Sequence, residues 1–279
     1  MIFNDADLAY RHLYNQVCAF GVTKADRTET GTLSLFGAEY MINVRKDRFP
    51  IITSKRVYWK SVFAELLWFI SGQDHIRDLQ EYTHIWDDWA DEDGNLDTAY
   101  GNYWRNFPGK DGERYDQLFW AVNNLDQKPE SRRSHVTAWY PPNAMFSRLP
   151  PCHHSFTLNV TPRSDGQNEV NIHVQQRSGD LALGIPFNMS SYSLLLILIA
   201  NELGMAPGFL YHTITDLHIY DNHRENLKVQ LVERDPTLAE ASVEFPVNTS
   251  LFDLSLKHLD EFDVVGYQHA GPLYFPIAV

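Results

Sequence analysis

Residues 176 to 188 read Gln176-Arg177-Ser178-Gly179-Asp180-Leu181-Ala182-Leu183-Gly184-Ile185-Pro186-Phe187-Asn188. Before them, residues 169 to 177 have the pattern of a strand, and after them residues 189 to 203 predict a buried helix that ends at Gly204. The Arg177-Ser178 pair suits an anion, because a guanidinium offers a fork of donors and the hydroxyl adds one more. Asn188 carries both a donor and an acceptor, as reading the amide-like edge of a pyrimidine requires.

The rest of the chain predicts an α+β fold in which helices pack on a mixed sheet. Two more helices are expected, the second of them mostly buried and ended by Gly72, and their ranges are 5 to 20 and 58 to 71. Further strands are expected over residues 33 to 44, 134 to 140, 155 to 162, 209 to 220 and 241 to 245. Residues 83 to 112 are rich in Trp, Asp, Gly and Tyr and predict loops over a site. No repeat or linker divides the sequence, so we expect one domain over residues 1 to 279.

Composition and charge limit the classes of function and partner that the chain could have. The chain has 279 residues, 44% of them hydrophobic and 21% charged, which is ordinary for a globular protein. Its 23 basic and 36 acidic groups give a net charge of −13, so neither nucleic acid nor an anionic membrane is an expected partner. The first residues lack the features of a signal peptide, and the longest apolar run, Leu194 to Ala200, is too short to span a bilayer. We therefore expect a cytoplasmic protein.

Cys152 is the candidate nucleophile. It precedes His153 and His154, and Cys18 is the only other cysteine, so no disulfide framework or paired-cysteine metal site is expected. A lone cysteine beside histidines can attack carbon, although the alternative for any single cysteine is a buried structural thiol. No metal is expected.

A third cluster lies at Asp216-Leu217-His218-Ile219-Tyr220. His218 and Tyr220 alternate on a predicted strand, so both side chains point to one face and could hold sugar hydroxyls. Each feature has an ordinary alternative: Arg177 in an interior salt bridge, Asn188 as a helix N-cap, and the His218 and Tyr220 pair as strand packing. Taken together with Cys152, these residues favour a binding site.

The chain resembles the thymidylate synthase family nearly from end to end. The most specific match runs from Gln176 to Tyr192. The other matching segments are Asp26-Arg27-Thr28, residues 31 to 37, Ser54-Lys55-Arg56, residues 65 to 69, Ile85-Trp86-Asp87, Tyr100-Gly101, Trp104-Arg105, Ser131-Arg132-Arg133, Pro151-Cys152-His153 and residues 276 to 279.

The resemblance implies a reaction. Cys152 would attack C6 of dUMP as a thiolate, and C5 would then take up a one-carbon unit from 5,10-methylenetetrahydrofolate. Nearby arginines, Arg177 first among them, should lower the pKa of the thiol. Glu65 would move protons through ordered water, and Tyr100 would help to remove the C5 proton. The resemblance also places His153 and Asp180 among the catalytic residues.

The resemblance assigns binding roles as well. Ligands of the phosphate would be Arg27, Arg177 and Ser178, joined by Arg132 and Arg133 of a second subunit; this implies a homodimer formed through a face of the sheet. Gln176 would contact the nucleotide, Asn188 would read uracil, and His218 and Tyr220 would hold the 3′-hydroxyl. Folate-binding residues would be Lys55, Trp86, Trp89, Asp180, Gly184, Phe187 and Val279. The ordinary alternative for Lys55 and for the Arg132-Arg133 pair is a solvated cation.

Several departures from the family pattern leave two outcomes open. They are Asp97-Thr98-Ala99 before Tyr100, Tyr103 in place of Gln, Thr157 in place of Gln, and Thr215 and Leu217 around Asp216. Hydride transfer to the exocyclic methylene gives dTMP and dihydrofolate, whereas attack by water gives 5-hydroxymethyl-dUMP. Trp86, His153 and residues 276 to 279 favour the first product. Asn188 favours uracil, since related enzymes acting on dCMP carry Asp there. An inactive nucleotide-binding regulator is the third alternative.

Overall fold

The computed structural model describes residues 1–25, 29–96, 99–234 and 241–277. Among these residues, seven strands form one mixed sheet in the order β1-β3-β9-β8-β7-β6, with β2 paired to β3. The central strands β8 and β9 are parallel, and β3, β7 and β6 join them in antiparallel pairs. The bounds are β1 (Ile2–Phe3), β2 (Val22–Lys24), β3 (Thr32–Asn43), β6 (His135–Thr137), β7 (Ser155–Pro162), β8 (Asn168–Asp180) and β9 (Ala206–Tyr220).

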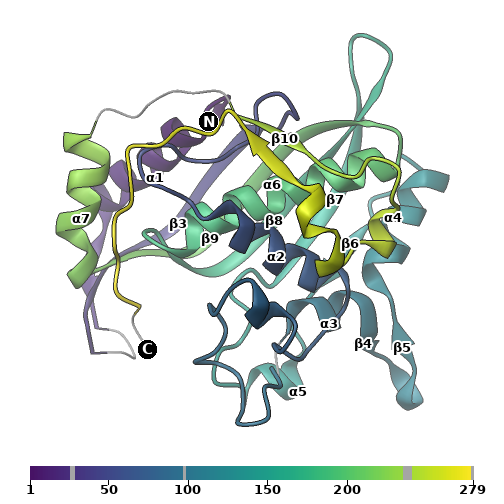
Figure 1. Ribbon diagram of the computed structural model, residues 1–279, viewed down its shortest axis with the longest axis horizontal. Helices are drawn as coiled ribbons and strands as arrows, with labels where there is room; N and C mark the ends of the chain where they lie inside the picture. Colours follow the sequence, from purple (N-terminus) through teal and green to yellow (C-terminus); the bar gives the residue numbers. More distant parts are fainter. Residues whose placement is uncertain (26–28, 97–98, 235–240, 278–279) are drawn as a thin grey trace.

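Helices α1 and α6 pack on the sheet, and α2 packs on α6 (Figure 1). The α-helices are α1 (Ala6–Phe20), α2 (Trp59–Ile70), α3 (Tyr100–Asn106), α4 (Gln117–Gln127), α5 (Pro141–Ala144), α6 (Gly184–Glu202) and α7 (Arg224–Lys228). Short helical turns span Leu79–Glu81, Lys110–Gly112, Asp221–His223, Val229–Glu233, Leu251–Asp253 and Leu256–Glu261. Two small antiparallel sheets pair β4 (Phe107–Pro108) with β5 (Arg114–Tyr115), and β10 (Ser242–Glu244) with β11 (Asp263–Val265). This architecture confirms the expected α+β class.

Helix α6 is the centre of the core. It packs on β8, β9 and α2, and nearly all of its side chains are buried. The helix is long and apolar enough to cross a membrane by length and composition, but 83% of that window is buried inside the protein. Such burial is typical of the central helix of a folded core rather than of a lipid-facing segment.

Helix α2 places one carboxylate inside the same core. Its residues from Val62 to Ile70 are all buried, and Glu65 lies in the middle of this run. The helix ends before Gly72, whose φ of 74° is the left-handed conformation that glycine adopts without strain. The run of apolar neighbours therefore fixes Glu65 in a position that water reaches poorly.

Most predicted elements are confirmed, and the differences lie near the site. Strand β7 has the predicted bounds, and α1, α2 and β3 agree closely with prediction. Strand β8 continues to Asp180, and α6 begins at Gly184 rather than at residue 189. The expectation of loops throughout residues 83 to 112 was wrong, because this segment contains α3. Gly101 lets α3 lie against α2: a Cβ there would approach the Phe69 carbonyl oxygen to 2.3 Å.

Candidate active site

A cavity of about 940 Å³ lies between the ends of β8 and β9, the beginning of α6, and helices α2 and α3. Its volume is in the range of sites for small organic ligands. Fifteen residues predicted from the sequence line it, and they are Glu65, Trp86, Trp89, Tyr100, Cys152, His153, Gln176, Arg177, Ser178, Asp180, Gly184, Phe187, Asn188, His218 and Tyr220. The fold therefore brings together residues that are up to 155 positions apart (from 65 to 220) in the sequence.

Cys152 is held beside Arg177. Nη2 of Arg177 lies 3.7 Å from Sγ and donates to the Pro150 carbonyl at 2.7 Å, while Nε donates to the Pro151 carbonyl at 3.0 Å. The two carbonyls and the backbone bond from Arg177 N–H to Cys152 O (2.8 Å) fix the loop on β8. Burial of the thiol raises the pKa of Cys152, and the guanidinium lowers it by less. The expected lowering by Arg177 is present, but burial outweighs it, so the expected net direction was wrong.

Glu65 faces the cavity with one defined partner. The indole Nε1–H of Trp86 donates to Oε1 of Glu65 at 2.8 Å. Burial raises the pKa of this carboxyl to about 7, while the indole hydrogen bond acts in the opposite direction. A carboxyl with such a pKa can both accept and donate a proton near neutral pH.

Tyr100 and His153 form a stacked pair next to Cys152. Their ring centroids are 4.0 Å apart with planes 7° from parallel. The Cys152 backbone N–H donates to the Tyr100 hydroxyl oxygen at 2.7 Å, and the Nδ1 atom of His153 lies 2.7 Å from the Tyr192 hydroxyl. Burial keeps the pKa of Tyr100 well above its usual value and lowers that of His153 to about 3. Near neutral pH both rings are therefore uncharged, and Tyr100 keeps a proton to donate.

A fully buried hydrogen-bond chain fixes Gln176 in the cavity wall. The amide nitrogen of Gln176 donates to the Ser178 carbonyl at 2.8 Å, so its oxygen must accept from Nε2 of His212, which is 2.8 Å away. Burial lowers the pKa of His212 to about 3, so the ring is neutral and its Nδ1 accepts from the Tyr40 hydroxyl at 3.0 Å. The donor and the acceptor in each of these hydrogen bonds are therefore defined.

Replacing Tyr40 with Phe should lower the free energy of unfolding by about 1 to 3 kcal/mol, because Nδ1 of His212 would lose the hydroxyl that donates to it in a dry site. Urea unfolding followed by fluorescence measures the change. The matched control is Tyr115→Phe, since that hydroxyl bonds to Glu113 on the surface and its loss should leave the free energy of unfolding nearly unchanged. Equal effects of the two substitutions would contradict the argument.

The cavity also has an apolar part to its lining. Its apolar lining comes from Ile85, Trp86, Trp89, Leu183 and Phe187. Asp180 accepts from the Ala182 backbone N–H at 2.8 Å, and Asn188 lies inside α6 rather than at its N-cap. Apolar and aromatic side chains with a few polar groups are typical of a site for a small organic ligand. In the described part of the chain, no three His, Cys, Asp or Glu side chains are grouped so that they could hold a metal ion.

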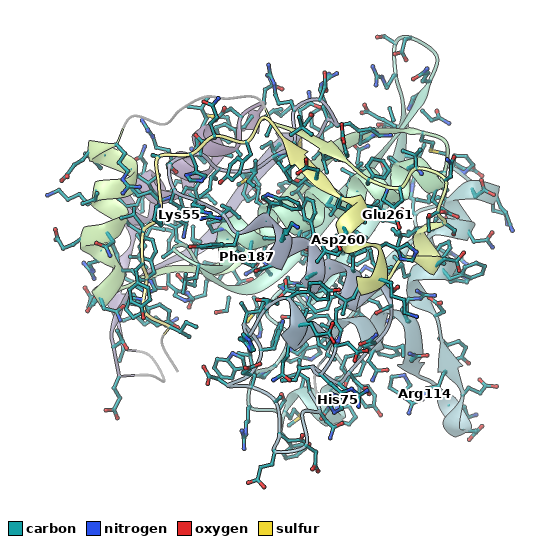
Figure 2. The ribbon with its side chains drawn as sticks, in the orientation of Figure 1. Lys55, His75, Arg114, Phe187, Asp260 and Glu261 are labelled. Carbon is teal, nitrogen blue, oxygen red and sulfur yellow. The ribbon has the colours of Figure 1, made fainter. Side chains whose placement is uncertain are left out.

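Three residues predicted for the site are described by the structure but are not in the cavity wall. Lys55 is buried: its Nζ donates to the Ala182 carbonyl at 2.6 Å and lies 4.5 Å from the centroid of the Phe275 ring (Figure 2). Burial lowers the pKa of Lys55 to about 8, against the opposite effect of Asp180, so the solvated alternative was wrong. Arg132 and Arg133 are exposed and lie outside the cavity. Arg27 and Val279 lie outside the described residues.

Other lining residues were not predicted from the sequence. They include Lys24, Arg148, Asp216, Tyr274 and Phe275. Asp216 had a usable signal, because it lies two positions before His218 on one strand and so points to the same face. The two aromatic residues had no such signal in the sequence. They belong to the C-terminal segment, whose Pro276 carbonyl accepts a hydrogen bond from His223 at 2.7 Å. That segment runs beside α7 in Figure 1.

Comparison with known proteins agrees with this geometry. A family model described as thymidylate synthase matches residues 8–279, and the chain belongs to the thymidylate synthase family. One curated relative, named thymidylate synthase, comes from Haloferax volcanii. It is 42% identical over 229 residues, which cover 75% of this chain and 65% of that protein.

Proposed function

We propose that this protein transfers a one-carbon unit to C5 of dUMP and releases dTMP. The observation that carries the proposal is the placement of Cys152 Sγ against the Arg177 guanidinium in a cavity that Glu65 and Asn188 also line. Family membership supports the same conclusion. The co-substrate, 5,10-methylenetetrahydrofolate, would supply the carbon unit and the hydride.

The residues of this chain fit distinct steps. Attack by Cys152 Sγ on C6 forms a carbon–sulfur bond and moves an electron pair to C5, which becomes the nucleophile. Arg177 stabilises the thiolate at 3.7 Å, and its two carbonyl contacts hold the attacking sulfur in place. After C5 has formed a bond to the methylene carbon, loss of the C5 proton expels tetrahydrofolate and leaves an exocyclic methylene. Hydride transfer from tetrahydrofolate to that methylene returns an electron pair to C5, which breaks the carbon–sulfur bond and frees the thiolate. Glu65 and the Tyr100 hydroxyl are the groups on the cavity wall that can carry protons in these steps.

The nucleotide would lie along β8 and β9. Arg177 and Ser178 would bind its phosphate, and the base would meet Asn188 on α6. We expect three further arginines to complete the phosphate site. They are Arg27 of this chain, and Arg132 and Arg133 of a second copy. We propose that a homodimer forms through the sheet face opposite α6, where partly exposed side chains such as His173 and Tyr211 alternate with buried ones. The same proposal treats residues 1–279 as one catalytic domain.

Reduction rather than hydration is the better supported outcome. Among the departures from the family pattern, Asp97 and Thr98 lie outside the described residues, and Tyr103, Thr157 and Leu217 do not line the cavity. Leu217 is fully buried, and the Thr157 hydroxyl pairs with His135 across the β6–β7 pair. Trp86 and His153, which favour hydride transfer, do line it. The alternative product is 5-hydroxymethyl-dUMP.

The experiment that tests the function combines enzyme, dUMP and methylenetetrahydrofolate. Mass spectrometry of the nucleotide and the absorbance of dihydrofolate are followed together. A methylated product with dihydrofolate supports the proposal, whereas a product heavier by one oxygen atom with tetrahydrofolate identifies a hydroxymethylase. Turnover of neither kind, with no covalent adduct to 5-fluoro-dUMP, would favour the inactive regulator.

Replacing Asn188 with Asp should shift the preference from dUMP toward dCMP by about 100-fold in kcat/KM, because a protonated carboxyl can pair with the amino edge of cytosine. Competition between the two nucleotides measures the shift. Asn201→Asp, near the other end of α6 and outside the cavity, is the matched control. An unchanged affinity of Asn188→Asp for dUMP would mean that Asn188 does not read the base.

A further inference from the structure

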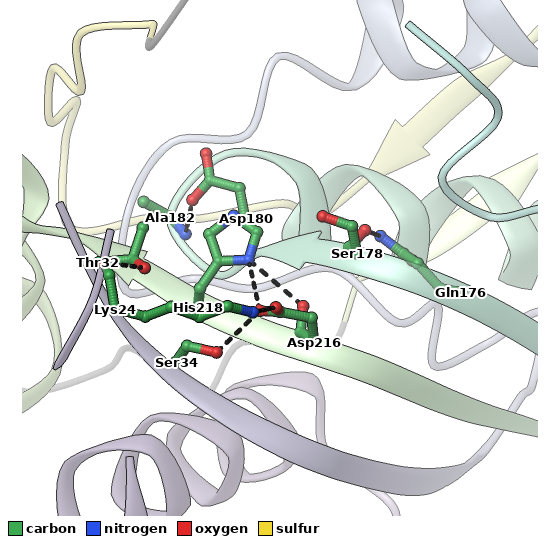
Figure 3. Close-up of polar contacts among 9 residues, drawn as sticks. All are labelled: Lys24, Thr32, Ser34, Gln176, Ser178, Asp180, Ala182, Asp216 and His218. Carbon is green, nitrogen blue, oxygen red and sulfur yellow. Dashed lines mark hydrogen bonds and ion pairs between the residues drawn. The ribbon is translucent and has the colours of Figure 1, made fainter. Parts of the chain in front are cut away.

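His218 lies near the end of β9 with one ring nitrogen facing oxygen atoms only. Its Nδ1 is 3.3 Å from the backbone carbonyl oxygen of Asp216 and 3.3 Å from Oδ1 of the same residue (Figure 3). A carbonyl and an ionised carboxylate accept hydrogen bonds and donate none. The proton of a neutral His218 ring must therefore be on Nδ1.

The carboxylate of Asp216 is kept ionised and oriented by two further groups. Nζ of Lys24 forms an ion pair with Oδ2, and the Ser34 hydroxyl donates to Oδ1 at 3.0 Å. The hydrogen bond from His218, followed by those from Lys24 and Ser34, lowers the pKa of Asp216 far below its usual value against partial burial. The three partners come from β9, β2 and β3, so the sheet itself sets this geometry.

The second nitrogen of His218 is the one available to a ligand. His218 is largely buried and lines the cavity, and among the described residues no hydrogen bond to its Nε2 is found. With the proton on Nδ1, a neutral imidazole presents a lone pair at Nε2. Such a nitrogen accepts from a hydroxyl and gains nothing from a group that has no proton to donate.

We propose that Asp216, held by Lys24 and Ser34, is a positioning residue that fixes the His218 tautomer so that Nε2 accepts a hydrogen bond from the sugar hydroxyl. The inference rests on the proposed function. It adds a selection rule: the site takes nucleotides whose 3′-oxygen carries a proton and discriminates against 3′-deoxy nucleotides. Lys24 has a second effect, because it neutralises a carboxylate in the wall of a site proposed to bind a phosphate.

The experiment measures the affinities for dUMP and for 2′,3′-dideoxyuridine 5′-monophosphate by calorimetry. The wild-type protein should prefer dUMP by about 10-fold. Asp216→Ala should reduce this preference to less than about 3-fold. The freed Lys24 ammonium should change both affinities alike, so the ratio of the two affinities is the readout. Asp216→Asn keeps an oxygen acceptor for Nδ1–H and should restore most of the preference. The matched control Asp260→Ala, at an exposed carboxylate (Figure 2), should keep the wild-type ratio.

A second measurement does not depend on any variant that could misfold. Long-range proton–nitrogen spectra of the histidine-labelled wild-type protein, at about pH 8, should show His218 protonated at Nδ1 and bare at Nε2. The opposite tautomer, or an Asp216→Ala protein that binds both nucleotides more weakly with an intact ratio, would overturn the inference. Equal binding of both nucleotides by the wild-type protein would overturn it as well. Binding of neither would refute the proposed function, and the spectrum would still decide the tautomer.

Discussion

Replacing Cys152 with Ser is expected to lower kcat by at least about 1,000-fold, because a serine hydroxyl is a far weaker nucleophile than a thiolate at neutral pH. The side chains of cysteine and serine are similar in size, so the substitution should disturb packing little. The bonds from Arg177 to the Pro150 and Pro151 carbonyls do not involve the sulfur, so the loop should keep its shape. The loss would therefore report on chemistry rather than on folding.

Two assays make this prediction specific. Turnover is followed by dihydrofolate absorbance, and covalent attachment of 5-fluoro-dUMP is followed by intact-protein mass. Cys152→Ser should fail both, while calorimetric binding of dUMP should remain. The matched control is Cys18→Ser, since Cys18 is exposed on α1 and lies outside the cavity. Residual turnover above about 10% of wild type in Cys152→Ser would show that the cysteine is not the nucleophile.

Most of the predicted residues that the structure describes do line the cavity, but the electrostatics of the cavity could not be predicted from the sequence. The residue types between Gln176 and Asn188 indicate binding of an anion and of a pyrimidine edge. Strand alternation predicts that His218 and Tyr220 lie on one face. The pKa of Cys152 depends on how deeply the thiol is buried, and that depth comes from α3 and from the loop clamped by Arg177. The presence of an arginine in the site predicts the sign of one contribution to the pKa of the thiol, but it does not predict the sum of all contributions.

Element boundaries were missed where tertiary contacts override local preference. The residues of α3 include Gly101 and three aromatic residues, a poor sequence for a helix, and the helix forms because Gly101 allows backbone contact with Phe69 on α2. Strand β8 continues past Arg177 because β9 supplies its partners, pairing Ser178 with Asp216 and Asp180 with His218. A polar stretch has no hydrophobic period from which such an extension could be predicted.

Replacing Glu65 with Gln is the second substitution with a large expected effect: kcat should fall by about 100- to 10,000-fold. The carboxyl has a pKa of about 7 because it is buried, and it faces the cavity beside Trp86. Gln keeps the acceptor for the indole N–H but cannot exchange a proton. The pH profile of kcat/KM should therefore lose the ionisation near neutral pH that the wild-type enzyme shows. Glu261→Gln, at an exposed site, is the control for both readouts.

The same substitution should stabilise the protein at alkaline pH. The folded-state pKa of about 7 lies above the ordinary value of 4.5, so the folded protein binds more protons than the unfolded chain between these pH values. The stability that Glu65 contributes is present at low pH and is lost as pH rises through 7. Gln carries no charge at any pH, so Glu65→Gln should match the wild type near about pH 4 and exceed it by up to about 3 kcal/mol near about pH 9.

Stability and activity would then change in opposite directions at one residue. Chemical unfolding of the wild type and of Glu65→Gln across this pH range measures the difference, and Glu261→Gln should follow the wild-type curve. A buried carboxylate that costs stability when it ionises is retained only where its proton is used, because an apolar or amide side chain would stabilise the fold more. If Glu65→Gln gains no stability at high pH, the carboxylate is well solvated in the folded protein. Its pKa would then be ordinary, and Glu65 could not carry protons near neutral pH.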